Sequence, residues 1–246
     1  MLIGGLQKFS LLDYPGHLSA IIFTQGCNLR CQFCYNPMLV RSAKPDKSKY
    51  LSLAKNKQNK GHLCLSEDDL LAFLKARRGK LEAVVITGGE PTIQPDLVEF
   101  LTKIKKSGYL VKLDTNGTNP EKLKLLIRKK LVDYIAMDIK ASSAGYQKIT
   151  KKKINFDKIR QSVKIIMASC LPYEFRTTLA PGLVGGKDLK EIAQLIKGAD
   201  RWYLQQFKSN MPLVNPKLVG KKAFSQREME EMAEIGRKYV KKCEIR

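Results

Sequence analysis

The chain contains the run Leu18-Ser19-Ala20-Ile21-Ile22-Phe23-Thr24-Gln25-Gly26, and three cysteines follow directly: Cys27, Cys31 and Cys34. The run is short, rich in β-branched and aromatic residues, and bounded by Pro15-Gly16 and Gly26, so it predicts a buried strand. The cysteines have C-x₃-C-x₂-C spacing, and a loop this short can bring three thiolates to one metal centre. The stretch therefore predicts a metal loop at the carboxyl end of a strand.

Two metals suit three such thiolates. An iron–sulfur cluster held by three cysteines would leave one iron open for a further ligand, which is typical of a reactive site. Zinc is the alternative, with His17 or His62 as a fourth ligand, because C-x₂₋₄-C spacing is also ordinary for zinc. Spacing favours the cluster, since no second Cys/His pair follows at a finger-like distance and Cys64 has only His62 near it.

Further along the chain, short apolar runs alternate with helical patterns, which is typical of βα units in a parallel sheet. The predicted strands are 18–24, 83–87, 109–114, 132–137, 173–179 and 202–207. The predicted helices are 66–77, 95–106, 120–130, 156–169, 187–196 and 225–241, the last with a Ser225/Glu228 capping box. Six strands instead of eight predict an α/β fold with an open, partial (β/α)6 TIM-like barrel.

Polar motifs follow several of these strands, on the edge where a parallel barrel gathers catalytic groups. Gly88-Gly89-Glu90 could bring backbone close to an amino-acid ligand, or could simply form a tight turn. Asp114-Thr115-Asn116 could face a cationic cofactor or close an Asx turn. Asp138 and Lys140 lie on one side of an extended chain and could pair with each other.

Two more side chains have both a functional and a structural interpretation. Arg176 could clamp a carboxylate or a peptide carbonyl, or pair with Glu174. Phe33 could pack on an adenine ring or seal the cysteine loop from water.

Composition limits the class of protein. The chain has 246 residues, 43% hydrophobic, which suits one domain, 1–246, with a polar lysine-rich insertion at about 42–62 and a C-terminal helix at about 225–241. No apolar run approaches the length of a membrane helix, and we expect no secretion signal. Clustered cysteines favour reduced thiols and a cytoplasmic location. The net charge of +22 is spread along the chain without an RNA-binding motif, so we expect no nucleic-acid partner.

The ordered motifs resemble the radical S-adenosylmethionine (SAM) superfamily. The pattern C-x₃-C-x-Φ-C, with Phe33 before the last cysteine, is similar to the superfamily signature. Longer stretches are similar to the activating enzymes of glycyl-radical enzymes, most of all those of anaerobic ribonucleoside-triphosphate reductases. These stretches are 5–10, 13–16, 23–27, 87–92, 114–117, 137–140 and 205–207.

The resemblance implies a partial barrel of the radical SAM type, with Cys27, Cys31 and Cys34 holding one 4Fe–4S cluster. It implies that Gly88 and Gly89 bind the methionine ammonium of SAM while Glu90 braces their loop. Further members of the implied cofactor site are Asp114, Thr115, Asn116, Asp138, Lys140 and Arg176, with a cation expected beside Asp114 and Asp138, and Asp13 is an expected substrate contact.

The implied activity is reductive cleavage of SAM, followed by hydrogen abstraction from a backbone glycine of a partner glycyl-radical enzyme. The implied electron donor is a flavodoxin or ferredoxin. Two departures from the family pattern bear on the partner: Tyr35 replaces the histidine of C-H-N-P, and Tyr14 replaces the glycine of D-G-P-G. The alternatives are a radical SAM enzyme acting on a small molecule or RNA base, and a zinc-stabilised nucleic-acid-binding module.

Overall fold

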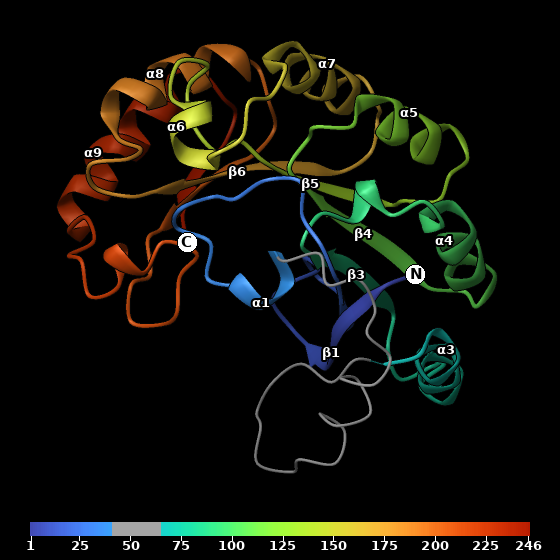
Figure 1. Ribbon diagram of the computed structural model, residues 1–246. Helices are drawn as coiled ribbons and strands as arrows, with labels where there is room; N and C mark the ends of the chain where they lie inside the picture. Colours follow the sequence, from blue (N-terminus) through green and yellow to red (C-terminus); the bar gives the residue numbers. More distant parts are fainter. Residues whose placement is uncertain (41–64) are drawn as a thin grey trace. The chain divides into compact units, whose positions relative to one another are not determined.

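The computed structural model describes residues 1–40 and 65–246 (Figure 1). Its strands are β1 (Ile3–Ser10), β2 (Ser19–Thr24), β3 (Ala83–Gly88), β4 (Leu110–Thr115), β5 (Tyr134–Asp138), β6 (Tyr173–Leu179), β7 (Trp202–Gln206) and β8 (Cys243–Ile245). They follow chain order in one sheet. The six predicted strands correspond to β2–β7, so the predicted α/β class is confirmed.

Two strands were not predicted. β1 pairs antiparallel with β2, in a register interrupted by irregularities. The segment contains two glycines and lacks the alternation of apolar and polar residues that indicates a strand. β8 has three residues and pairs parallel with β7, so its extended form depends on a long-range partner.

The helices are α1 (Pro37–Val40), α3 (Glu67–Ala76), α4 (Leu97–Lys106), α5 (Pro120–Arg128), α6 (Tyr146–Thr150), α7 (Phe156–Met167), α8 (Gly186–Leu195) and α9 (Gln226–Arg237), with short 3₁₀ turns η1 (Pro91–Ile93) and η2 (Pro216–Leu218). Ser66 caps α3, and the Ser225 capping box of α9 is confirmed. Predicted boundaries erred by a few residues: α9 ends at Arg237, not near Lys241.

The described chain forms two compact units. The first contains Met1–Asn28, Met38–Asp114 and Leu126–Tyr134, and the second contains Leu29–Pro37, Thr115–Leu125 and Ile135–Arg246. In the first unit, Tyr14, Ile21, Ala83, Val85 and Tyr134 form an apolar cluster. In the second, the largest fully buried side chains include Trp202, Tyr146 and Phe175.

Strand register aligns the ends that carry the predicted motifs. In the first unit, Thr24 at the end of β2 is opposite Gly88 at the end of β3. In the second unit, Asp138 at the end of β5 is opposite Arg176 in β6. Parallel pairing therefore sets the neighbours of each motif, because it places the carboxyl ends of adjacent strands at one edge.

The structure leaves two expectations from the sequence untested. The predicted insertion at 42–62, together with His62 and Cys64, lies outside the described residues, and the single-domain expectation remains a prediction. Among the helices of the described ranges, none has the length and apolar character needed to cross a membrane.

Candidate functional site

The cysteine loop begins in one unit and ends in the other. Cys27 follows β2 in the first unit, while Cys31 and Cys34 belong to the second. Cys31 is buried, Cys27 and Cys34 are half-buried, and no disulfide joins the cysteines of the described ranges. Burial raises the pKa of the Cys34 thiol, and the positive charge of Lys140 partly offsets this effect.

Within the second unit, the end of α6 fixes one side of this loop. The Arg30 amide donates to the carbonyl of Thr150 (2.8 Å), and the Gln32 amide donates to that of Ile149 (3.0 Å). The Gln32 side chain also donates to the carbonyl of Lys148 (3.0 Å). These bonds hold the backbone on both sides of Cys31.

The segment before η2 fixes the other side. The Val214 amide donates to the carbonyl of Cys34 (2.9 Å), and the Asn215 amide donates to that of Gln32 (3.0 Å). Asn215 Nδ2 also donates to Gln32 Oε1 (2.7 Å). The roles of Gln32 and Asn215 were missed, because their partners lie more than a hundred residues away and no local pattern indicates them.

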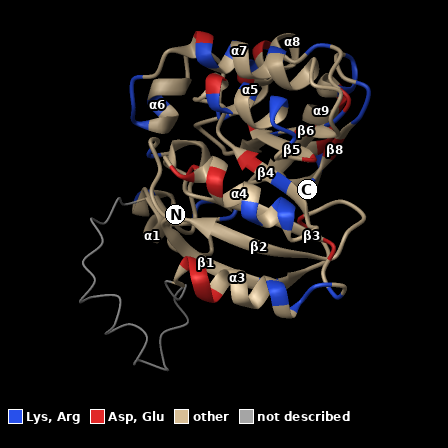
Figure 2. Ribbon diagram, turned by 90° about the vertical axis from the view of Figure 1, so that its right-hand side faces the viewer, with Lys and Arg blue, Asp and Glu red and all other residues tan. Residues whose placement is uncertain are grey.

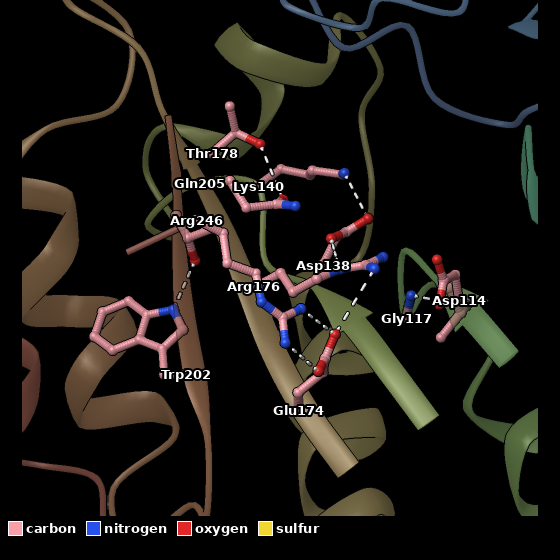
Figure 3. Close-up of polar contacts among 12 residues, drawn as sticks. Asp114, Gly117, Asp138, Lys140, Glu174, Arg176, Thr178, Trp202, Gln205 and Arg246 are labelled. Atoms are coloured by element: carbon pink, nitrogen blue, oxygen red, sulfur yellow. Dashed lines mark hydrogen bonds and ion pairs between the residues drawn. The ribbon is translucent and has the colours of Figure 1, made fainter. Parts of the chain in front are cut away.

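Three charged side chains meet beside this loop (Figure 3). Asp138 Oδ2 lies 3.0 Å from Lys140 Nζ, and Asp138 Oδ1 lies 2.8 Å from Arg176 Nε. Burial alone would raise the pKa of Asp138, but Arg176 and Lys140 outweigh it and hold that pKa well below its usual range. Burial alone would lower the pKa of the Lys140 ammonium group. The negative charges of Asp138 and Cys31 outweigh burial and raise that pKa above its usual range. The predicted Asp138–Lys140 pair is confirmed.

The network continues into the buried side of β6. Glu174 is fully buried and lies 3.9 Å from Arg176 Nη1, which confirms the predicted pairing. Its second partner is Arg246, with Nη1 3.1 Å from Oε1 and Nη2 3.4 Å from Oε2 (Figure 3). The guanidinium of Arg246 also stacks over the ring of Tyr203, 3.3 Å from its centroid. No local pattern indicates Arg246 as a member of this network, because it lies 72 residues from Glu174 in the sequence.

In the first unit, the glycines after β3 are constrained by close backbone packing. A Cβ on Gly88 would lie 2.3 Å from the Thr24 nitrogen, and one on Gly89 would lie 1.9 Å from the Gly26 oxygen. The Gly89 amide donates to Thr24 and the Glu90 amide to Gly26, both at 2.9 Å. With these donors engaged, the loop can offer carbonyl oxygens to a ligand, and carbonyls suit an ammonium group.

Glu90 follows these glycines, and its bracing of their loop stays a prediction. It is buried, and its Oε1 accepts hydrogen bonds from the amide and the hydroxyl of Thr92. It thereby caps the η1 turn.

The Asp114-Thr115-Asn116 motif is divided between the units after Asp114. In the first unit, Asp114 Oδ1 lies 3.4 Å from the buried Lys112 Nζ, which also donates to the carbonyl of Asp13 (2.6 Å). In the second unit, Asn116 Oδ1 accepts from the Thr118 amide (3.0 Å), so the predicted Asx turn is confirmed.

The remaining predicted residues have local partners. Thr115 is buried and accepts from the Gly117 amide (3.2 Å). Asp13 accepts from the Ser10 hydroxyl in the turn after β1. Phe33 is 5% exposed, as a residue that seals the loop would be, and its contact with adenine remains a prediction. His17 Nδ1 lies 3.3 Å from Glu82, so the zinc interpretation gains no support from this histidine.

The donor chemistry of these residues fits an iron–sulfur cluster with SAM. Within the described ranges, no group of three His, Cys, Asp or Glu side chains is already gathered as a metal site, so the fit rests on chemistry. Thiolates are the ligands of such clusters. Gln206 Oε1, at the end of β7, is buried and receives no hydrogen bond from the described residues, so a ligand donor could satisfy it.

Comparisons with known proteins agree with this chemistry. The model of the radical SAM superfamily matches residues 21–197. A Methanocaldococcus jannaschii protein, provisionally named a glycyl-radical enzyme activating enzyme, is 31% identical over 100% of this chain and 95% of its own length. The pyruvate formate-lyase-activating enzyme of Clostridium pasteurianum is 28% identical, over 79% of this chain and 76% of its own length.

A solved structure supports the fold alone. The crystal structure of QueE from Escherichia coli has a TM-score of 0.56 and 20% identity, and the match covers 100% of this chain and 93% of that one. This likeness, together with the superfamily match over residues 21–197, confirms the predicted fold of the radical SAM type. The cofactors of the chain are a three-cysteine 4Fe–4S cluster and SAM. Matched over more than two thirds of its length, the chain belongs to the radical SAM superfamily and is an oxidoreductase of that superfamily.

Proposed function

We propose that this protein activates a glycyl-radical enzyme, and that its partner is an anaerobic ribonucleoside-triphosphate reductase. The observation that carries the first part is the end-to-end similarity to the Methanocaldococcus jannaschii relative, over 100% of this chain. The partner is inferred from the ordered motifs between Gly5 and Phe207, which resemble the activators of those reductases.

In this proposal the side chains hold and orient the cofactors. Cys27, Cys31 and Cys34 hold the cluster, and the carbonyls of Gly88 and Gly89 accept from the ammonium of SAM. Lys140 and Arg176 supply positive charge for its carboxylate, while Asp138 keeps both cations in place at 3.0 and 2.8 Å.

The remaining proposed members come from different parts of the sheet: Thr115 ends β4, whereas Asp13 follows β1, whose carboxyl end is paired with the amino end of β2. Phe33 packs against the adenine, Thr115 and Asn116 line the cofactor, and a cation lies beside Asp114 and Asp138. Asp13 contacts the partner's glycine loop.

When bound, the cluster would supply one electron for the reductive cleavage of SAM to methionine, and the 5′-deoxyadenosyl radical from that cleavage would take hydrogen from a glycine of the partner. The protein's own task is to position the reactants and exclude water. The electron donor in this proposal is a flavodoxin or ferredoxin, and the compartment is the cytoplasm, since thiolate ligands require reducing conditions.

The proposal is tested with anaerobically reconstituted protein, SAM, dithionite and candidate glycyl-radical enzymes, followed by electron paramagnetic resonance. We expect about four irons per chain and a protein-centred glycyl radical on the anaerobic reductase. Cys31→Ala should abolish the radical, whereas Cys170→Ala, which changes an exposed cysteine outside the site, should retain it.

Two results would contradict the proposal. One tightly bound zinc in place of iron would remove the cofactor chemistry. SAM cleavage that leaves every candidate glycyl-radical enzyme without a radical would instead favour a small molecule or RNA base as substrate.

A further inference from the structure

Two lysine-rich segments border the cysteine loop in the second unit. One contains α6 and the other surrounds η2, and neither contains an acidic residue: Asp and Glu are absent from 139–156 and from 207–227. Their exposed lysines, called here the lysine surface, are Lys148, Lys151, Lys152, Lys153, Lys208, Lys217, Lys221 and Lys222. The chain beside α6 is blue over a continuous stretch in Figure 2.

Hydrogen bonds attach both segments directly to the loop. Gln32 accepts from Asn215 on one side and donates to the carbonyl of Lys148 on the other, at 2.7 and 3.0 Å. The η2 segment is closed on itself, because the Gly220 amide donates to the carbonyl of Ser209 (2.9 Å). The lysines are therefore held on backbone that is fixed relative to Cys31 and Cys34.

These lysines differ from the cations of α9. There, Arg227 pairs with Glu231 (2.9 Å) and Arg237 pairs with Glu230 (2.6 Å). No member of the lysine surface forms an ion pair with a residue of the described ranges. Like charges gathered without ion pairs create a positive field, which attracts and orients an acidic partner and speeds its association.

The position of the cysteine loop between the two segments indicates which kind of acidic partner would dock here. Tyr35, next to Cys34, is 53% exposed, so the cysteine loop reaches the protein surface between the two segments. A partner docked here would lie close to the ligands of the cluster. Nucleic acid fits less well, because single-strand sites use several aromatic stacking platforms. Residues 148–153 and 208–222 contain no aromatic residue or arginine, which leaves Tyr35 without a second ring from these segments.

We propose that the lysine surface docks an acidic, low-potential electron-donor protein beside the cysteine loop. This inference rests on the proposed function, since it names the partner for the reduction that precedes SAM cleavage. The donor is oxidised by one electron and this protein is reduced by one, with no atom transferred between them.

The test compares two charge-reversal variants with a matched control. One variant carries Lys151→Glu, Lys152→Glu and Lys153→Glu, and the other carries Lys217→Glu, Lys221→Glu and Lys222→Glu. The control carries Lys75→Glu, Lys80→Glu and Lys106→Glu, which change the net charge equally at exposed positions of the first unit. Reduced flavodoxin is the acidic probe, and dithionite is the small reductant that needs no docking.

We expect both lysine-surface variants to be reduced by flavodoxin at least about tenfold more slowly at low salt, as expected for lost electrostatic steering. The control should change less than about twofold, and excess dithionite should reduce all the proteins to the same final extent. Calorimetric titration should show weaker flavodoxin binding to the same two variants, independently of any turnover.

Three outcomes would overturn the inference. Flavodoxin could reduce and bind all variants equally. The lysine-surface variants could lose the glycyl radical even with dithionite, which would assign the surface to the substrate protein. They could lose binding of a short RNA while flavodoxin binding is unchanged. Failure of the proposed function is seen separately, as no glycyl radical in the unchanged protein reduced by dithionite.

Discussion

The side chain of Arg246 lies against that of Glu174, with Nη1 3.1 Å from Oε1 and Nη2 3.4 Å from Oε2. Glu174 is fully buried, and its other cation is Arg176, which in turn holds Asp138 (Figure 3). One carboxylate thus balances two guanidinium groups behind the candidate site.

Glu174→Gln should destabilise the fold and weaken SAM binding, because two arginines would lose their shared counter-charge. Breaking a buried ion pair costs up to several kcal/mol, and we expect about 3 kcal/mol, since Arg246 is partly exposed. Denaturant unfolding measures the first effect and equilibrium binding of SAM the second.

The conservative variant Arg246→Lys retains the charge but loses the two-point contact, so it should lie between wild type and Glu174→Gln. Equal SAM affinity in all three proteins would show that Glu174 does not position Arg176.

Gly89→Ala should disrupt the loop after β3, because the added Cβ would meet the Gly26 carbonyl oxygen at 1.9 Å. Overpacking against backbone costs about 3 kcal/mol. The measurements are the unfolding free energy and SAM affinity.

Gly186→Ala is the matched control, since a methyl group added at this position, at the start of α8, would have no atom within 4 Å. It should be neutral, or stabilising by up to about 1 kcal/mol through helix propensity. Equal tolerance at both positions would contradict the role of close packing at Gly89.

Gln32→Ala should loosen the cysteine loop, because Gln32 is bonded both to Lys148 and to Asn215. Losing partners of buried polar groups costs about 1–3 kcal/mol. We expect faster loss of iron to a chelator, followed by absorbance, with little change in secondary structure.

The control is Asn210→Ala, which changes an exposed residue of the segment between β7 and η2 that also contains Asn215. It should leave iron retention unchanged. If the two variants released iron at the same rate, the anchoring role of Gln32 would be wrong.

Cys243 should give the protein an alkaline instability. Burial raises the pKa of its thiol to about 12. The pKa of a cysteine thiol in the unfolded chain is near 8.5. Below that pH the buried neutral thiol makes its full contribution to the stability of the folded state, and this contribution is lost as the pH rises towards 12. Within that window the loss is about 1.4 kcal/mol per pH unit.

Cys243→Ala should therefore flatten the fall of unfolding free energy between about pH 9 and 11. The difference in slope between the two proteins isolates the thiol from other titrating groups. Parallel slopes would contradict the prediction.

Interactions were predictable from the sequence where both partners lie in one short segment. Ser225 caps α9 through Glu228 three residues away, and the Asp138–Lys140 pair spans two residues of one extended chain. β1 and β8 were missed because each becomes a strand by pairing with a neighbour, and neither β1's glycines nor β8's three residues indicate this locally.

The sequence by itself determined the chemistry of this protein. Short local patterns indicate the cysteine spacing, the order of the strand-end motifs and the six parallel strands. Only the tertiary structure decided how these groups are held. Gln32 is fixed by residues 148 and 215, and Glu174 by Arg246, because hydrogen bonds and ion pairs between distant segments form only when folding brings those segments together.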